Sequence, residues 1–141
     1  KNDAPALDHI AWYGGNSGVD FDLESGYDSS DWPEKQYPHT KAGMHPVKLK
    51  RANPWGLYDV LGNVWEWCQD GRKQYDQDAQ ANPTGSLEAD TNRVLRGGSW
   101  NSNARFVRAA HRFAAPPDLR SGSFGFRCAR VQGEQSQPAA E

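Results

Sequence analysis

The apolar residues of this 141-residue chain fall in short blocks separated by long polar stretches. The first block, residues 7–12, ends at Gly14-Gly15 and predicts a short helix or turn. Residues 16–46 are rich in Asp, Ser, Gly and Pro, and therefore predict a long loop. Three aromatic residues are expected to anchor that loop: Tyr27, Trp32 and Tyr37.

The densest apolar stretch covers residues 54–68. Its pattern predicts one helical turn over residues 57–61, a break at Gly62-Asn63, and a strand over residues 64–68. Residues 93–100 predict a second strand that ends in a Gly-Gly bend, and residues 124–131 a closing strand. Residues 69–92 and 101–123 predict polar loops, and residues 132–141 a flexible tail.

Composition fits this irregular pattern. Six Trp and 14 Gly in one domain's length indicate a loop-rich fold held by aromatic anchors, rather than a helix bundle. No run of 18 apolar residues occurs, so no membrane span is expected. No basic-then-apolar leader opens the chain, so no signal peptide is expected in it, and the compartment stays open.

Charge is distributed unevenly. The net charge of -2 does not indicate a nucleic-acid partner, and none is expected. Residues 93–130 nevertheless carry eight Arg and a single acid, Asp118. The favoured interpretation is that these arginines satisfy carboxylates and loop carbonyls within the fold, and the alternative is a basic surface that faces a ligand. The two cysteines, Cys68 and Cys128, are either buried free thiols, which we favour, or one disulfide.

Three sequence blocks occur in a characteristic order: NPWGLYDVLGNVWEW at 53–67, RVLRGGSW at 93–100 and GFRC at 125–128. Together they resemble the formylglycine-generating-enzyme or sulfatase-modifying-factor family over roughly residues 8–131. The resemblance implies an α+β, irregular C-type lectin-like fold with little regular secondary structure, a small twisted antiparallel sheet and bound calcium. Residues 1–131 would be the C-terminal portion of one such domain.

The family's N-terminal half is not in this chain. The favoured explanation is that it exists as a separate, docked chain after cleavage, because an isolated C-terminal half would leave sheet edges and apolar faces uncovered. A divergent short form is the alternative.

The resemblance also locates two metal sites. Family enzymes oxidise a substrate cysteine with copper held by two cysteines after the RGGS-aromatic motif, and Ser102 and Val107 stand at those positions. Neither is a soft thiolate ligand, so no copper and no catalytic residue is expected. The family's calcium site corresponds to Asp59, Gly62, Val64 and Glu66, two carboxylates and two carbonyls of the kind Ca²⁺ binds. The alternative is that Asp59 caps a turn and Glu66 pairs with an arginine.

Residues 101–124 resemble the variable region of diversity-generating-retroelement proteins, which share this fold. Exposed aromatic residues beside small polar residues and arginines are typical of recognition surfaces. Phe106 and Phe113 are expected to be exposed, with a role as core anchors as the alternative. The predicted ligand-binding residues are Asn101, Ser102, Asn103, Phe106, His111, Phe113, Ala115, Leu119, Ser121 and Ser123.

The sequence therefore predicts a non-catalytic module that binds a protein or other macromolecule through residues 101–124. One alternative is an oxidase-like enzyme of the formylglycine type. The other is a regulatory domain cleaved from a larger effector such as a kinase or protease.

Overall fold

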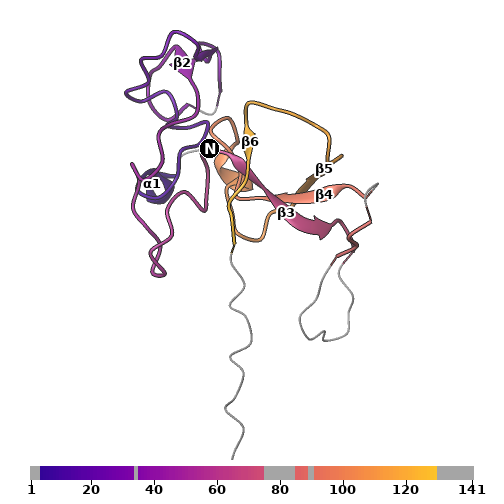
Figure 1. The fold of residues 1–141 in the computed structure, drawn as a ribbon. Helices are drawn as coiled ribbons and strands as arrows, with labels where there is room; N and C mark the ends of the chain where they lie inside the picture. Colours follow the sequence, from indigo (N-terminus) through magenta and orange to yellow (C-terminus); the bar gives the residue numbers. More distant parts are fainter. Residues whose placement is uncertain (1–3, 34, 75–84, 89–90, 130–141) are drawn as a thin grey trace, which may run out of the picture.

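The computed structural model describes residues 4–33, 35–74, 85–88 and 91–129. An N-terminal part, which contains one short helix and a two-stranded sheet, lies beside a four-stranded sheet (Figure 1). The elements of the N-terminal part are α1 (Pro5–Asp8), β1 (Tyr27–Asp28) and β2 (Lys41–Ala42). The second part contains β3 (Trp65–Gly71), β4 (Arg93–Arg96), the 3-10 helix η1 (Ala104–Phe106), β5 (Phe113–Ala115) and β6 (Phe124–Gly125).

The four-stranded sheet has the order β5-β4-β3-β6. Pairs β3–β4 and β4–β5 are antiparallel, whereas β3 and β6 are parallel, with Trp65 opposite Phe124. The expected α+β class with little regular secondary structure is confirmed, and the sheet differs from a purely antiparallel one in its last strand. The parallel pairing arises because the chain crosses from β5 past the opposite edge of β3 before it forms β6.

Several local predictions are confirmed. A short helix precedes Gly14, and strands form within residues 64–71 and 93–96. Gly97 and Gly98 then bend the chain with φ of 91° and 80°. The closing strand is shorter than expected, because only Phe124–Gly125 pairs, while residues 130 and 131 and the predicted tail at 132–141 lie outside the described residues.

The helical turn predicted over residues 57–61 is wrong. Turns and bends occupy residues 54–64 instead. Asp59 has a φ of 53° and Gly62 a φ of 74°, and a right-handed helix requires negative φ at every residue. The apolar side chains that suggested a helix are spread over a tight series of turns.

Two apolar clusters form the core. One consists of Ala11, Tyr13 and Val107, so it joins the N-terminal part to the segment that follows β4. The other lies on the sheet and consists of Trp65, Leu95 and Ala115. Trp67 and Phe124, which are partly buried, pack against the second cluster.

Two of the three predicted aromatic anchors, Tyr27 and Trp32, lie against Trp100, and the third, Tyr37, lies at Asp8. The Trp32 ring stacks on Trp100 with 5.8 Å between centroids, and the Tyr27 ring lies 5.0 Å from it. The Tyr37 hydroxyl donates to Asp8 Oδ2 at 2.6 Å. Tyr27 and Tyr37 keep exposed faces, so these anchors pin the loop at its surface rather than in the core.

Gly62 and Asn63 join the two parts of the fold. A Cβ at Gly62 would lie 2.2 Å from the Trp12 carbonyl oxygen, so only glycine fits against that backbone. The Asn63 side chain pairs with the backbone of His45, donating to its carbonyl and accepting from its N–H, both at 3.0 Å. The GN pair of the sequence motif is therefore the structural joint of the molecule.

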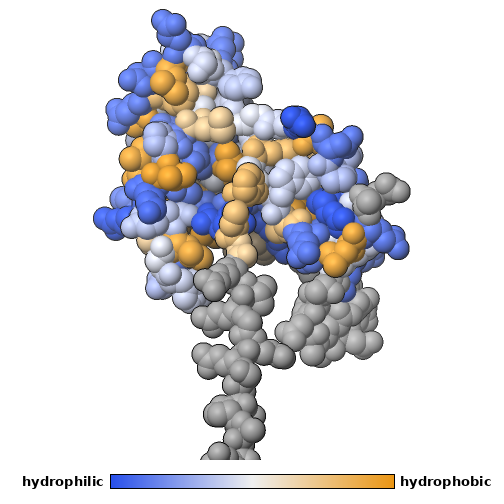
Figure 2. All heavy atoms as spheres, in the orientation of Figure 1, coloured by the Kyte–Doolittle hydropathy of each residue, from blue (hydrophilic) through white to orange (hydrophobic). Residues whose placement is uncertain are grey.

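Hydrophobic side chains form separate patches between hydrophilic ones on the face drawn in Figure 2. Among the described residues, no helix has the length and apolarity that crossing a bilayer would require.

Candidate functional site

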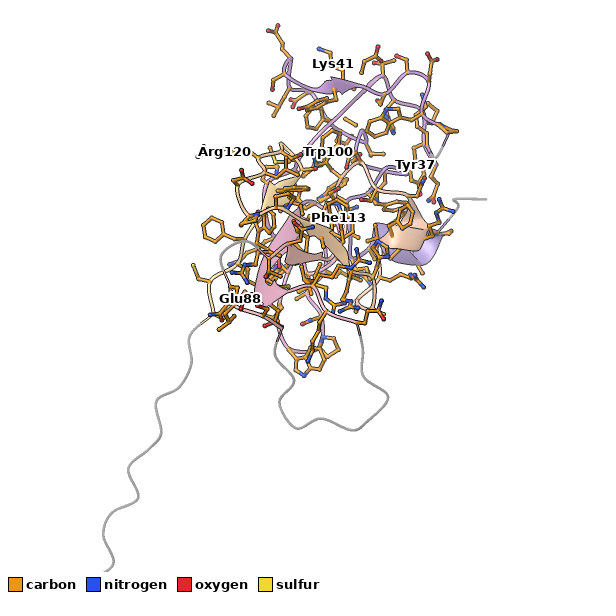
Figure 3. All side chains as sticks on the ribbon, turned by 90° about the vertical axis from the view of Figure 1, so that its right-hand side faces the viewer. Tyr37, Lys41, Glu88, Trp100, Phe113 and Arg120 are labelled. Carbon is orange, nitrogen blue, oxygen red and sulfur yellow. The ribbon has the colours of Figure 1, made fainter. Side chains whose placement is uncertain are left out.

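A groove with a volume of about 490 Å³ lies where β3, β5 and β6 begin. Its wall comes mainly from the segment between β4 and β6, and Phe113 stands near the middle of the molecule in Figure 3. Six of the predicted ligand-binding residues line it: Asn101, Phe106, His111, Phe113, Ser121 and Ser123. Trp65 and Phe124 complete the lining.

Strand register brings the aromatic side chains together. Trp65 lies opposite Phe124 in the β3–β6 pair, and β4 carries β5 with Phe113 opposite Leu95. The Phe113 ring centroid is 5.8 Å from that of Trp65 and 6.2 Å from that of Phe124. These rings are tilted by 42° and 54°, within the range that favours aromatic pairs.

His111 and Phe106 extend the aromatic wall. The His111 ring lies 5.6 Å from Trp65 and 5.0 Å from Phe106. Burial lowers the pKa of His111, and the nearby positive charges of Arg108 and Arg96 lower it further. The imidazole is therefore neutral around pH 7 and serves the groove as an aromatic, uncharged group.

The exposure expected for the two phenylalanines holds for Phe113, which is 43% exposed, whereas Phe106 is half-buried. Three polar groups of the groove have partners inside the fold. The Ser121 and Ser123 hydroxyls bond each other at 3.0 Å, and Asn101 Oδ1 accepts from the Ser99 hydroxyl at 2.7 Å. The groove therefore offers mainly ring surface to a ligand.

The other four predicted residues lie elsewhere. Ser102 and Ala115 are buried, the first against Ser99 and the second in the sheet core with Trp65 and Leu95, so the structure moves both from the surface to the interior. Asn103 is half-buried, and its Oδ1 has no hydrogen-bond partner in the described structure. Leu119 is exposed but outside the groove lining.

Trp65 and Phe124 are the lining residues that the predicted set omits. Their proximity follows from the parallel β3–β6 pairing, which joins positions 59 residues apart and leaves no local sequence signal. Phe124 lies within the segment 101–124 that the sequence predicts as the binding surface, whereas for Trp65 the aromatic WEW block is the hint that the sequence offers.

The favoured interpretation of the arginine excess predicted that arginines bond to loop carbonyls, and they do so. The Arg96 guanidinium donates to the carbonyls of Ala109, Ala110 and His111 at 3.1 to 3.3 Å. It thereby fixes the loop that carries His111 into the groove. Arg105 stacks over the Phe106 ring, 4.5 Å from its centroid.

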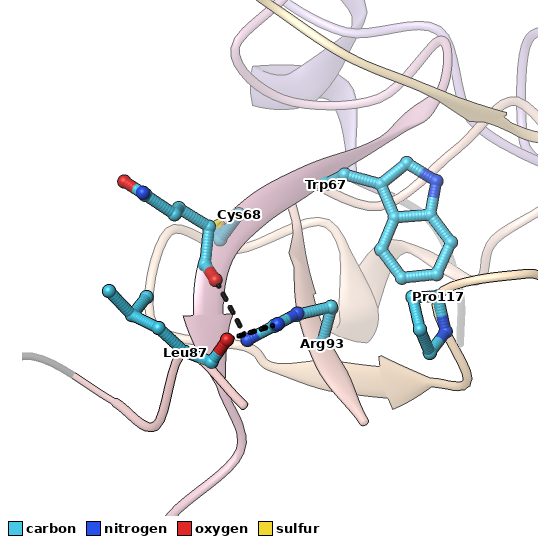
Figure 4. A pocket seen from close by; sticks show the side chains of 6 residues that line it. Trp67, Cys68, Leu87, Arg93 and Pro117 are labelled. Carbon is cyan, nitrogen blue, oxygen red and sulfur yellow. Dashed lines mark hydrogen bonds between the residues drawn. The ribbon is translucent and has the colours of Figure 1, made fainter. Parts of the chain in front are cut away.

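A second hollow of about 340 Å³ lies at the far end of β3 (Figure 4). Arg93 fills its wall and donates to four carbonyls, those of Gln69, Ser86, Leu87 and Glu88. These bonds occupy the guanidinium, so Arg93 holds the segment at 85–88 in place. The role of this hollow is therefore structural.

Both cysteines are free thiols, as favoured, but the expectation that both are buried is wrong. Cys68 lines the second hollow and is half-buried, whereas Cys128 is exposed because β6 ends before it. Burial raises the pKa of the Cys68 thiol.

The positions where the family's enzymes would hold copper do not fit that metal. Ser102 Oγ accepts from the Ser99 N–H at 3.1 Å and lies 3.0 Å from the Ser99 hydroxyl. Val107 is 2% exposed and packs against Ala11 and Tyr13. A bonded hydroxyl and a core isopropyl group provide no thiolate for Cu(I).

Three of the four predicted calcium ligands, Asp59, Val64 and Glu66, line a third hollow of about 430 Å³, and Gly62 is outside its lining. Glu66 forms a two-bond ion pair with Arg127 at 2.7 and 2.9 Å, as the alternative interpretation expected. Asp59 Oδ2 accepts from the Lys48 N–H at 2.8 Å, but its Oδ1 is buried without a partner in the described structure. A buried carboxylate oxygen without a donor fits a cation.

No group of three or more His, Cys, Asp or Glu side chains in the described part of the chain is arranged to hold a metal ion. A cation at Asp59 would therefore depend on backbone carbonyls, including those of Gly62 and Val64, as the predicted set has it.

The model of the sulfatase-modifying factor enzyme 1-like domain matches residues 9–132. Serine/threonine-protein kinase pkn1 of Chlamydia caviae is 45% identical over 89 residues, which are 60% of this chain and 14% of that protein. Formylglycine-generating enzyme of Streptomyces coelicolor is 42% identical over 101 residues, 68% of this chain and 32% of the enzyme.

One relative that is named as inactive and two solved structures are also similar to this chain. Inactive C-alpha-formylglycine-generating enzyme 2 of Bos taurus is 38% identical over 64% of this chain and 28% of its own length. Treponema denticola variable protein 1 superposes with a TM-score of 0.65 and 32% identity, covering 89% of this chain and 37% of that protein. PvdO from Pseudomonas aeruginosa gives 0.54 and 27%, covering 72% of this chain and 36% of its own. The chain thus spans well under half the length of these proteins.

Proposed function

Because this chain belongs to the family of sulfatase-modifying factor enzyme 1-like domains, we propose that it is a non-catalytic member that binds a protein or other macromolecule. The groove lined by residues from the 101–124 segment carries this proposal, since it gathers exposed ring surface at one place. The hydroxyl of Ser102 and the isopropyl group of Val107, where the family's enzymes need sulfur, support a binding role over an oxidising one.

The names of two similar proteins agree with a binding role rather than a catalytic one. One similar solved structure is by its name a variable protein, and one relative is named as inactive. We infer that the groove segment is the part of this chain that differs between copies. Copies from one genome that differ mainly within residues 101–124 are expected, and copies that differ evenly along the chain would contradict it.

A selection experiment tests the binding role. Random peptide phage are selected on the chain and then screened against Phe113→Ser, which removes the exposed ring from the groove. The matched control is Phe126→Ser, because Phe126 is also an exposed phenylalanine but lies outside the groove. Clones that bind the chain and the control but not Phe113→Ser are expected. Clones that bind all three equally would refute the proposal.

The oxidase alternative has a direct assay. The purified chain with added copper is incubated with a cysteine-containing peptide, and mass spectrometry follows the thiol. No aldehyde is expected. Copper-dependent aldehyde formation would overturn the non-catalytic assignment.

A regulatory role inside a larger effector is the second candidate. It is favoured by the kinase relative, which is 45% identical here but matches over only 14% of its own length. Intact-mass measurement of the natural precursor before cleavage tests this role. A precursor heavy enough to carry an effector domain is expected, and one too light to carry it would exclude the role.

We also propose that Asp59, Gly62, Val64 and Glu66 hold a structural Ca²⁺, with the unpartnered Asp59 Oδ1 as the supporting observation. Glu66 would then have to leave Arg127. A calcium-dependent rise in thermal stability that disappears in Asp59→Asn is expected. An equal rise in that variant would place the effect elsewhere.

We further propose that the family's N-terminal half packs as a separate chain against Leu57 and Phe126, which line the third hollow and are 45% and 77% exposed. Side chains of this size and exposure are costly to leave in water. Copurification of a second polypeptide that Phe126→Asp abolishes is the expected result. Copurification unaffected by that change would contradict the proposed contact.

A further inference from the structure

We propose that the groove receives an acidic protein segment that inserts one aromatic or large aliphatic side chain between Trp65, Phe106 and Phe113. This inference rests on the proposed binding function and specifies its partner. It follows from the apolar lining of the groove and from the charge of the surface around it.

The lining calls for an apolar anchor. The groove volume of about 490 Å³ is within the usual range of roughly 300–1,000 Å³ for ligand pockets. Its walls are tilted rings, with 5.8 Å between the centroids of Trp65 and Phe113, so a side chain entering between them meets apolar surface on several sides. Binding energy in protein interfaces concentrates at such aromatic pockets.

The surrounding charge calls for acidic neighbours of that anchor. Arg105, Arg108 and Arg120 are exposed, flank the lining residues in sequence, and form no ion pair within the part of the chain that the structure describes. The single acid between positions 93 and 129 is Asp118. Arginines that already bond to carbonyls, such as Arg96, are additional to these three.

The groups around His111 also indicate a positive electrostatic potential at the groove. Its pKa is lowered by burial and by two arginines, and no carboxylate is among the groups that act on it. Aromatic rings alone would also suit a cation, but positive neighbours oppose one. A neutral sugar is a weaker match, because no carboxylate lines the groove and the Ser121 and Ser123 hydroxyls bond each other.

The two features have separable effects. Removal of the anchor or of a ring wall should raise the dissociation rate, since buried contacts at the centre of an interface set the residence time. Reversing the charge of exposed arginines such as Arg105 and Arg108 should mainly slow association. It should also reduce the dependence of the association rate on salt concentration.

Four fluorescein-labelled heptapeptides test this inference by fluorescence polarisation: EEDFDEE, EEDADEE, SGSFSGS and KRKFKRK. The first should bind about tenfold or more tightly than each of the others, which corresponds to about 1.4 kcal/mol. Phe113→Ser and the double variant Arg105→Glu/Arg108→Glu should each weaken it by a similar factor. Phe126→Ser and Arg51→Glu, which change an exposed ring and an exposed arginine outside the groove, should not.

Each other outcome overturns the inference. If EEDADEE bound as tightly as EEDFDEE, the proposed insertion of an apolar side chain would be refuted. Equal and Phe113-dependent binding of SGSFSGS or KRKFKRK would remove the acidic requirement but leave the proposed binding function intact. If no peptide binds at about 1 mM, a level that corresponds to very weak affinity, the partner class is wrong, and the phage selection still decides the binding function separately.

Discussion

Replacing Asn63 by alanine should be among the most damaging single changes in this chain. Asn63 is 5% exposed and has a φ of 59°. Its side chain bonds the N–H and the carbonyl of His45, its own N–H donates to the Trp12 carbonyl at 2.8 Å, and its carbonyl accepts from the Trp100 N–H at 2.8 Å. One residue thus ties together three segments that are far apart in sequence.

The magnitude follows from what alanine would leave behind. The two backbone bonds of residue 63 can persist, but both side-chain bonds to His45 are lost, and that buried N–H and carbonyl then have no partner. An unsatisfied buried group costs about 1–3 kcal/mol. Alanine in the left-handed region adds about 1 kcal/mol relative to asparagine, which tolerates it. The free energy of unfolding should therefore fall by about 3–7 kcal/mol, a large share of the stability of a typical domain, about 5–15 kcal/mol.

Equilibrium unfolding in urea, followed by tryptophan fluorescence, measures this loss. Asn53→Ala is the matched control, since Asn53 Oδ1 also accepts two backbone N–H bonds, both at 3.0 Å, but at an exposed turn. Water replaces those bonds, so the control should lose about 1 kcal/mol or less. Equal losses for the two variants would refute the argument that burial of the His45 backbone sets the cost.

Three further predictions concern strain, thiol reactivity and pH. Gly62→Ala should destabilise far more than Gly56→Ala in urea unfolding, because both have φ near 75° but only Gly62 would place its Cβ against backbone; equal losses would contradict the close contact. Cys128 should react with iodoacetamide before Cys68, whose pKa burial raises, and equal rates by mass spectrometry would contradict the exposure difference. Burial lowers the pKa of His45 below 6.5, so the unfolded chain takes up the proton first. The contribution of neutral His45 to stability should be complete above pH 6.5 and should decline as the pH falls toward the pKa of His45 in the folded chain. The variant His45→Phe should show a smaller decline. An unchanged pH profile in that variant would assign the decline to other groups.

Local patterns predicted the local elements well. The strands at residues 65–71 and 93–96 and the bend after them follow from side-chain alternation and from paired glycines, which act over a few residues. The turn series at 54–64 was mistaken for a helix because positive φ at Asp59 leaves no mark on the spacing of apolar residues. The parallel pairing of β6 depends on where the chain passes between β5 and β6, which no periodicity records.

By itself the sequence determined the chemistry that each position can offer. Ser102 and Val107 cannot supply sulfur in any fold, because donor identity belongs to the residue and not to its surroundings. Only the tertiary structure decided which residues of 101–124 face a ligand. Phe113 and Ala115 are two apart on one strand, yet the first lines the groove while the second is covered by Trp65 and Leu95. Exposure is set by contacts between distant segments, and so it follows from strand register and packing rather than from the residues of one segment.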